Sequence, residues 1–237
     1  MEKALCRFAP SGQLNSTSSA IGTSSQSAEM HKSSVFIPES RPAINVLRTI
    51  CLSRGRRRRQ ASMFTRKQNR LAAAYYRGGT SRAIIFRQQD LPKDRKDWDL
   101  IFCGVIGSPD PNGRQLDGLG GGISSLSKVC VVGPSSHPEA DVDYTFAAIG
   151  VKHWDVDYSS NCGNMTSAIG PFAIDTGMVE AGGDTDVTVR IHNTNTGKII
   201  HSTFPVVEGE AASEGAFAID GVAGTAAKIK LAFINPA

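Results

Sequence analysis

Along the C-terminal two thirds of the chain, apolar and polar positions alternate with the two-residue period of β-strands. The alternation is clearest at residues 187–191 and 227–233 and predicts strands with one face in a core and one in solvent. A turn at residues 195–197 (Asn-Thr-Gly) leads from 187–191 into a strand at 198–204, the pattern of a hairpin. Short apolar runs predict four further strands, at residues 71–76, 83–86, 129–132 and 142–149.

Two segments have the pattern of helices. Apolar residues at positions 98, 101, 102 and 105 form one stripe; Pro92 is predicted to open this helix, and residues 107–110 to end it. The second helix, residues 166–175, is apolar nearly all round, with Gly177 as its C-cap. A helix without a polar face is buried. The sequence therefore predicts an α+β fold class, with a mixed, mostly antiparallel sheet wrapped around a buried central helix.

Composition divides the 237-residue chain into a basic tail and a mildly acidic body. Residues 1–67 contain 12 Lys and Arg against 3 Asp and Glu, whereas the rest contains 14 against 19, although the whole chain has a net charge of +4. We therefore expect a disordered, Ser-rich tail over 1–67 and a folded domain over 68–237. No nucleic-acid partner is expected for the acidic body. No stretch approaches 18 uncharged apolar residues, so no membrane span is predicted.

The tail admits three interpretations. It is basic, Ser-rich and poor in acids, as in an organelle transit peptide. Its Arg-rich run at residues 54–59 also fits a nuclear-type or RNA-binding patch. The third interpretation is an upstream start codon, with Met63 as the working start. The five widely spaced cysteines, without a CxxC pair, favour a reducing compartment, cytoplasmic or, with a transit peptide, mitochondrial.

Cys162 is the cysteine in the most suggestive position. It lies in the polar stretch Asn161-Cys162-Gly163-Asn164, directly before the apolar helix. Free N–H groups and the dipole at a helix start favour an anion and lower a thiol pKa, and Gly163 would let a ligand carboxylate reach them. Cys103 and Cys130, in predicted apolar elements, are interpreted as small buried hydrophobes. The histidines show no metal-binding spacing, and no metal site is predicted.

Lys128 lies between a glycine-rich loop, residues 118–127, and the predicted strand at 129–132. Partly desolvated near a helix dipole, such an amine could act as a base, although an exposed surface lysine is an equal interpretation. The loop lacks the dinucleotide fingerprint, because Ile123 occupies the third glycine position, and it has no P-loop Lys-Ser/Thr. It is interpreted as a carboxylate-binding loop, with Asp110 and Asp117 as turn residues.

These residues fall in an order that resembles the PrpF family, which includes 2-methylaconitate cis-trans isomerase, methylitaconate isomerase and oxalomesaconate tautomerase. The motifs are Arg77-Gly-Gly-Thr-Ser81, Gly107-Ser-Pro-Asp110, Asp117-Gly-Leu-Gly-Gly121, Ser127-Lys-Val129, Ala140-Asp-Val-Asp-Tyr144, Asn161-Cys-Gly-Asn164, Gly170-Pro-Phe-Ala173, Asn195-Thr196 and Ile219-Asp-Gly-Val222. Arg82 stands where the family usually has Lys, which conserves the charge.

The resemblance implies a diaminopimelate-epimerase-like fold, in which a barrel-like sheet wraps around a central helix. It also implies proton transfer without a cofactor on small tricarboxylic or dicarboxylic acids. It implies Lys128 and Cys162 as the acid/base pair, with neither assigned as base. Backbone N–H groups would stabilise the enolate-like charge. The implied substrate-binding residues are Gly78, Gly79, Thr80, Ser81, Gly120, Gly121, Ser127, Asn161, Gly163, Asn164 and Met165.

Family members have a second, similar domain, and this chain is expected to end where the first domain ends. An inactive half-enzyme that binds carboxylates or a partner chain is therefore the alternative function, and the exposed domain face could form a homo-oligomer. Nucleic-acid binding by residues 54–59 is a third and weaker hypothesis.

Overall fold

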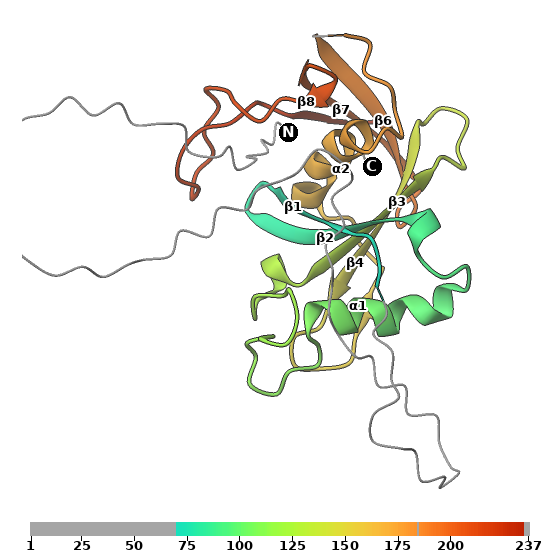
Figure 1. The fold of residues 1–237 in the computed structure, drawn as a ribbon, viewed down its shortest axis with the longest axis vertical. Coiled ribbons are helices and arrows are strands. Elements are labelled where there is room, and N and C mark those ends of the chain that lie inside the picture. Colours follow the sequence, from blue (N-terminus) through green and yellow to red (C-terminus); the bar gives the residue numbers. More distant parts are fainter. Residues whose placement is uncertain (1–69, 184, 235–237) are drawn as a thin grey trace, which may run out of the picture.

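The computed structural model describes residues 70–183 and 185–234 (Figure 1). The predicted tail over 1–67, its Arg-rich run, Met63, Cys6 and Cys51 lie outside the described residues. Within the described ranges there is no helix with the length and apolar character needed to cross a membrane.

The described part of the chain forms a nine-stranded sheet and two α-helices. The strands are β1 (Ala74–Gly78), β2 (Ser81–Arg87), β3 (Lys128–Pro134), β4 (Val142–Ile149), β5 (Val156–Asp157), β6 (Asp186–Asn193), β7 (Lys198–Val207), β8 (Glu210–Ala211) and β9 (Lys230–Phe233). The helices are α1 (Trp98–Ile106) and α2 (Gly163–Asp175), with short 3-10 turns η1 (Gln88–Asp90), η2 (Arg95–Asp97) and η3 (Ser124–Leu126).

The sheet is mixed but mostly antiparallel. Its strand order is β1-β2-β3-β4-β6-β7-β8, with β5 added beside β4 and β9 beside β7. Among these strand pairs, only β2–β3 and β4–β6 are parallel. The predicted hairpin at residues 187–204 is the β6–β7 pair, which runs from Asn193↔Lys198 to Asp186↔Pro205. The predicted α+β class is confirmed.

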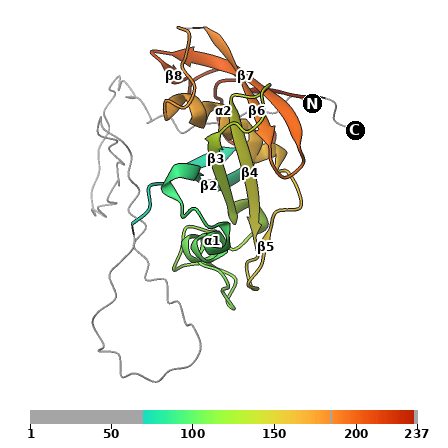
Figure 2. The ribbon, with the colours of Figure 1, turned by 90° about the vertical axis from the view of Figure 1, so that its right-hand side faces the viewer.

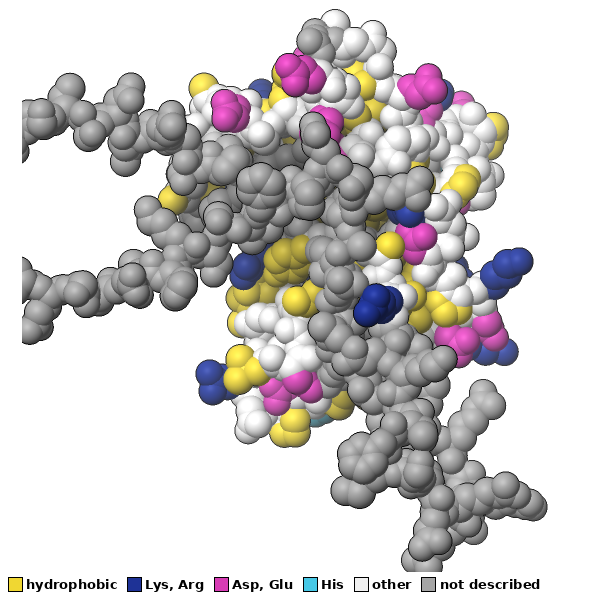
Figure 3. Space-filling view, in the orientation of Figure 1, with side chains coloured by type: hydrophobic (Ala, Val, Ile, Leu, Met, Phe, Trp, Pro, Cys, Tyr) yellow, Lys and Arg dark blue, Asp and Glu magenta, His cyan; other side chains and the backbone are white. Residues whose placement is uncertain are grey.

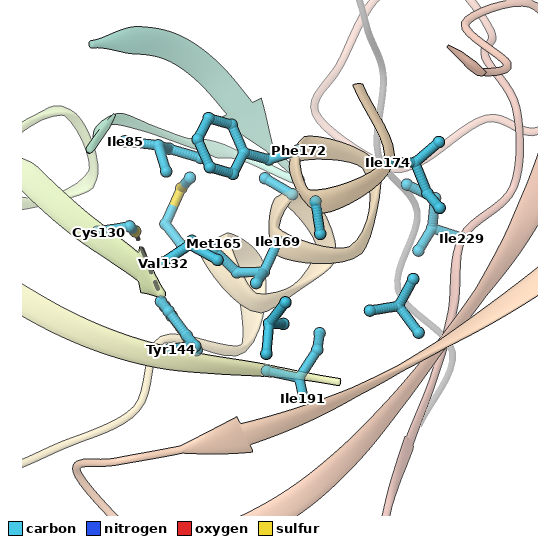
Figure 4. Close-up of a cluster of buried hydrophobic side chains, with 14 of the residues drawn as sticks. Ile85, Cys130, Val132, Tyr144, Met165, Ile169, Phe172, Ile174, Ile191 and Ile229 are labelled. Carbon is cyan, nitrogen blue, oxygen red and sulfur yellow. Dashed lines mark hydrogen bonds between the residues drawn. The ribbon is translucent and has the colours of Figure 1, made fainter. Parts of the chain in front are cut away.

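Helix α2 lies inside the curl of the sheet, as Figures 1 and 2 show. It contacts β1, β2, β3, β6, β7, β8 and β9, and every residue from Met165 to Ile174 is buried. The side chains around it include Ile85, Cys130, Tyr144 and Ile191, so the inner face of the sheet and α2 share one core (Figure 4). The sequence prediction of a buried central helix is therefore confirmed.

Asp175 links the two ends of the strand order. The Tyr76 hydroxyl on β1 donates to Asp175 Oδ2 (2.5 Å), and the Ala211 N–H on β8 donates to Asp175 Oδ1 (3.1 Å). The last residue of α2 thus joins the first and last strands of the curl, which are far apart in sequence.

Helix α1 covers the outer face of the same sheet. Phe102 stacks on Phe86 of β2 with ring centroids 6.0 Å apart, and Trp98 packs beside Phe102 at 5.9 Å. Side chains of β3 alternate between the two cores, with Val129 and Val131 facing α1 and Cys130 and Val132 facing α2. Charged side chains of both signs occur on the face shown in Figure 3.

The first predicted strand is displaced: residues 71–73 are not in a strand, and β1 is Ala74–Gly78 rather than 71–76. Two further predicted boundaries are wrong. Pro92 does not open the first helix: the Asp94 side chain accepts the Lys96 N–H (3.0 Å) and caps the 3-10 turn η2, and α1 begins only at Trp98. The last strand does not begin at residue 227, because Ala226 is bridged to Phe217 and only Lys230–Phe233 pairs with β7. In both places the backbone is engaged in a local hydrogen bond, and the regular helix or strand begins only after it.

Candidate active site

The β1–β2 turn packs directly on the first turn of α2. A Cβ atom at Gly78 would come within 2.3 Å of the Asn164 carbonyl oxygen, so only glycine fits there. Gly79 has φ +55°, a conformation that glycine adopts at little cost. The Asn164 Nδ2 donates to Thr80 Oγ1 (2.9 Å) and to Ser81 Oγ (3.3 Å). The structure therefore brings together the two motifs that contain Gly78–Ser81 and Asn161–Met165.

Cys162 is the N-cap residue of α2. Its backbone is extended (φ −102°, ψ 99°) and its side chain makes no capping hydrogen bond. Its carbonyl oxygen accepts the Thr166 N–H (2.9 Å) and lies 3.0 Å from the Thr166 hydroxyl, which is also 3.0 Å from Asn161 Oδ1. Cys162 therefore stands at the helix start, where the first N–H groups have no intrahelical partners, and its free thiol belongs to a partly exposed residue.

Lys128 is the first residue of β3 and points to the inner face of the sheet. Alternation places it on the same face as Cys130, which belongs to the core around α2. Its ammonium nitrogen lies 5.2 Å from the ring centroid of Phe146, another member of that core. The side chain is half-buried, so the interpretation as a fully solvated surface lysine is wrong.

The thiol of Cys130 lies within electrostatic reach of both Lys128 and Cys162. Burial raises its pKa, Cys162 raises it further, and the Tyr144 hydrogen bond and Lys128 lower it. Since Cys162 also packs against the α2 core, Lys128 and Cys162 border the same region of the molecule.

Cys103 and Cys130 are buried, as expected of structural cysteines. Burial, with the nearby charges of Asp99 and Asp155, raises the pKa of Cys103 to about 11. A thiol that stays protonated is a poor nucleophile or base at neutral pH. Among the described cysteines, Cys162 is the one that is not fully buried.

The glycine-rich loop packs against the end of α1. The Leu119 N–H donates to the Val105 carbonyl (2.7 Å) and the Gly120 N–H to the Ile106 carbonyl (3.0 Å). A Cβ at Gly121 would lie 2.4 Å from the Leu126 side chain. These glycines therefore have a packing role in addition to any contact with a ligand.

Asp110 is a turn residue, as predicted. Its carboxylate accepts the backbone N–H groups of Asn112 (2.9 Å), Arg114 (3.0 Å) and Gln115 (2.6 Å). These bonds, Asn112 and Gln115 first, lower its pKa. In the described ranges, no three side chains of His, Cys, Asp or Glu lie together in a way that could hold a metal ion.

Sequence analysis missed two buried polar residues near these motifs. Gln115 has no exposed surface, and its amide bonds to Ser108, Gly122 and Ser127. Tyr144, also fully buried, accepts a weak hydrogen bond from Cys130 Sγ (3.9 Å; Figure 4). Gln115 has no local signal, because it lies in a polar loop. Tyr144 ends the motif Ala140-Asp-Val-Asp-Tyr144, but the pattern does not distinguish it from an ordinary aromatic residue of a strand.

Comparison with known proteins identifies the family. Residues 68–237 match the family model described as PrpF protein. The chain belongs to the PrpF family. The fold agrees with this membership: the chain resembles the crystal structure of methylitaconate-delta-isomerase with a TM-score of 0.63 and 44% identity, over 66% of this chain and 40% of that one. The diaminopimelate-epimerase-like fold expected from the sequence is confirmed.

Several curated relatives in the PrpF family are named as isomerases or tautomerases. The chain is 43% identical over 177 residues to 2-methyl-aconitate isomerase of Cupriavidus necator, covering 72% of this chain and 45% of that protein. It is 44% identical over 170 residues to 3-methylitaconate isomerase of Eubacterium barkeri (72% and 44%) and 41% identical over 170 residues to 4-oxalomesaconate tautomerase of Pseudomonas putida (72% and 46%). The chain thus spans less than half the length of these relatives.

Proposed function

We propose that this PrpF-family chain provides the acid/base pair of an isomerase that moves a proton and a double bond in aconitate-like unsaturated tri- or dicarboxylic acids. The observation that carries the proposal is the placement of the Cys162 thiol at the start of buried helix α2, with Lys128 on the inner face of the same curled sheet. The names of the relatives support the reaction class and a small carboxylate substrate.

The proposed step needs no cofactor and no redox change. One of Lys128 and Cys162 removes a proton from a carbon adjacent to the double bond, and the C–H electron pair forms a new C=C bond. The electrons of the old double bond then take a proton from the other residue at the far carbon. The pair ends with its protonation states exchanged, and positioned acid/base groups of this kind typically contribute about 10²- to 10⁴-fold in rate.

The substrate carboxylates are proposed to bind where α2 begins. N–H groups of Gly163, Asn164 and Met165 at the helix start favour an anion and would stabilise the developing enolate-like charge. Met165 is fully buried, so its contribution is through the backbone. The remaining proposed contacts come from the β1–β2 turn, from the residue before Cys162 and from the glycine-rich loop: Gly78, Gly79, Thr80, Ser81, Asn161, Gly120, Gly121 and Ser127.

Proton exchange in D₂O tests the proposal. The full chain is mixed with an aconitate-type acid, and deuterium incorporation is followed by NMR. Cys162→Ser and Lys128→Met should each lower the exchange rate by about 100-fold or more, because each removes one member of the pair. Exposed Lys230→Met and buried Cys103→Ala serve as matched controls and should retain the wild-type rate.

Exchange that is insensitive to Cys162→Ser would contradict the proposal. The alternative, a carboxylate-binding module without turnover, is separated by calorimetric titration with tricarballylate, a saturated tricarboxylate. Binding of tricarballylate without any exchange of the unsaturated acid would favour the binding module.

A further inference from the structure

We infer that Gln115 is a positioning residue of this site. Its buried amide holds the glycine-rich loop and Ser127 in place, and thereby sets the position of Lys128 at the start of β3. The role given to the loop and to Lys128 rests on the proposed function. The inference itself rests on the hydrogen bonds, burial and backbone conformation of Gln115.

The Gln115 side chain joins three segments. Its Nε2 donates to Ser108 Oγ (2.8 Å), which follows α1 in the chain. Its Oε1 accepts the Gly122 N–H (2.8 Å) and the Ser127 hydroxyl (2.8 Å). Its backbone carbonyl accepts the Gly118 N–H (3.1 Å), so both ends of the glycine-rich loop are bonded to one residue.

The backbone around this amide is unusual. Gln115 has φ +54°, which disfavours a side chain with a Cβ, and yet Gln115 has no exposed surface. A Cβ at Gly120 would lie 2.2 Å from Gln115 Oε1, so the loop closes on the amide only because glycine is present. A sparsely populated conformation persists where the surrounding structure imposes it, and such positions concentrate at functional sites.

The connection to Lys128 passes through Ser127. This serine is fully buried; its hydroxyl lies 2.8 Å from both Gln115 Oε1 and the Ile123 carbonyl, and its own carbonyl accepts the Ile149 N–H of β4 (2.9 Å). Lys128 is the next residue and the first of β3. Without the amide, the Ser127 hydroxyl and the Gly122 N–H would each lose one hydrogen-bond partner. Both losses would fall directly before the start of β3.

Two substitutions at Gln115 distinguish the effect of the amide hydrogen bonds from the effect of side-chain size. Gln115→Met conserves the length of the side chain and removes every hydrogen bond that the amide makes. Gln115→Glu retains an acceptor for Gly122 and Ser127, and the Ser108 hydroxyl can rotate to donate to the carboxylate. Gln115→Glu is therefore the conservative variant, and Gln89→Met, at an exposed position of η1, is the control.

The first measurement is amide hydrogen exchange of the full chain by NMR. In Gln115→Met, exchange of the Gly122 N–H should accelerate by about tenfold or more, because its acceptor is gone. The Leu119 and Gly120 N–H groups donate to α1 carbonyls and serve as internal references. Gln115→Glu should restore Gly122 protection.

The second measurement distinguishes positioning from mere stability. The reactivity of Lys128 toward acetic anhydride is followed against pH by peptide mass spectrometry, with exposed Lys230 as reference. Gln115→Met should shift the Lys128 profile and leave that of Lys230 in place. The kcat of the exchange assay should fall by about tenfold or more, since small misplacements are costly at reacting groups.

Unchanged Gly122 exchange, or an unchanged Lys128 profile in a folded Gln115→Met protein, would overturn the inference. If Gln115→Met does not fold, Gln115→Glu is compared by hydrogen exchange alone, because its buried carboxylate would itself act on nearby charged groups. Wild-type protection of the Gly122 N–H is then required. Absence of turnover in the wild-type chain would refute the proposed function and leave the exchange and labelling comparisons for Gln115 intact.

Discussion

At the scale of single residues, the side-chain amide of Asn195 makes the backbone hydrogen bonds that a neighbouring strand would otherwise make. Asn195 follows β6, where the parallel ladder with β4 has ended. The Phe146 N–H donates to its Oδ1 (2.8 Å), and its Nδ2 donates to the carbonyls of Phe146 (2.8 Å) and Tyr158 (2.7 Å). One side chain thus joins β4, whose Phe146 ring lies beside Lys128, to the segment that leads toward Cys162.

Asn195→Asp should destabilise the protein by about 2 kcal/mol or more, because two donated bonds are lost and a carboxylate is placed against two carbonyl oxygens. The measurement is the free energy of unfolding in urea at pH 7. Gln89→Glu makes the same chemical change at an exposed position and should alter stability by less than about 0.5 kcal/mol. Equal effects of the two substitutions would show that the Asn195 bonds contribute nothing.

At the scale of elements, the approach of α2 to β7 depends on a glycine within the helix. A Cβ at Gly170 would lie 2.6 Å from Phe204 Cε1 and 2.8 Å from Ser202 Oγ. The Ser202 hydroxyl is fully buried and has no hydrogen-bond partner among the residues that the structure describes. Close packing is thus maintained here at the expense of one unsatisfied polar group, which indicates that the distance between helix and sheet is tightly constrained.

Gly170→Ala is expected to destabilise the protein by about 1–3 kcal/mol through overpacking. In an unconstrained helix the same change would stabilise by about 0.5–1 kcal/mol, so the sign of the effect is the test. Thermal and urea unfolding measure it. Gly182→Ala, where no atom lies within 4 Å of the added Cβ, is the control and should be close to neutral. Stabilisation by Gly170→Ala would mean that α2 can move away from β7.

At the scale of the whole molecule, carboxylates tie loops and strands together. Burial favours the neutral form of Asp143, but hydrogen bonds from Ser136 and His192 outweigh it and lower the pKa. The same balance, with Arg190 as partner, lowers the pKa of Asp141. Hydrogen bonds also lower the pKa values of Asp110 and Asp157. These four carboxyl groups lie in different parts of the fold, so the pH dependence of stability is expected to reflect their summed contributions.

Stability should therefore fall in acid. A carboxyl whose pKa is lower in the folded state contributes stability above its unfolded value of about 4, and this contribution is lost as pH falls through the folded value. Urea unfolding between pH 7 and pH 3 should show a decline below about pH 4. Asp143→Asn should lower stability at pH 7 and reduce the acid-dependent loss, whereas exposed Asp186→Asn should leave both nearly unchanged. A decline of equal size in Asp143→Asn would contradict the contribution assigned to that residue.

The sequence by itself determined the elements and the class of the fold. The period-two pattern located the β6–β7 hairpin around Asn195–Gly197, since alternation reflects a core on one side of a sheet. A short apolar run located β4 at its observed bounds. The apolar composition of residues 166–175 identified the buried helix. It also placed Cys162 at the helix start, because a polar stretch directly precedes the apolar one.

Only the tertiary structure decided which of these parts meet. Asn164 bonds to Thr80 and Ser81, more than 80 residues away, and Asp175 to Tyr76 across 99 residues; such contacts leave no trace in a local pattern. The left-handed backbone of Gln115 and the partners of its amide are likewise fixed by surrounding packing rather than by its own preference. Periodicity reports the face on which a residue lies, whereas the neighbours across that face depend on how the whole sheet curls around α2.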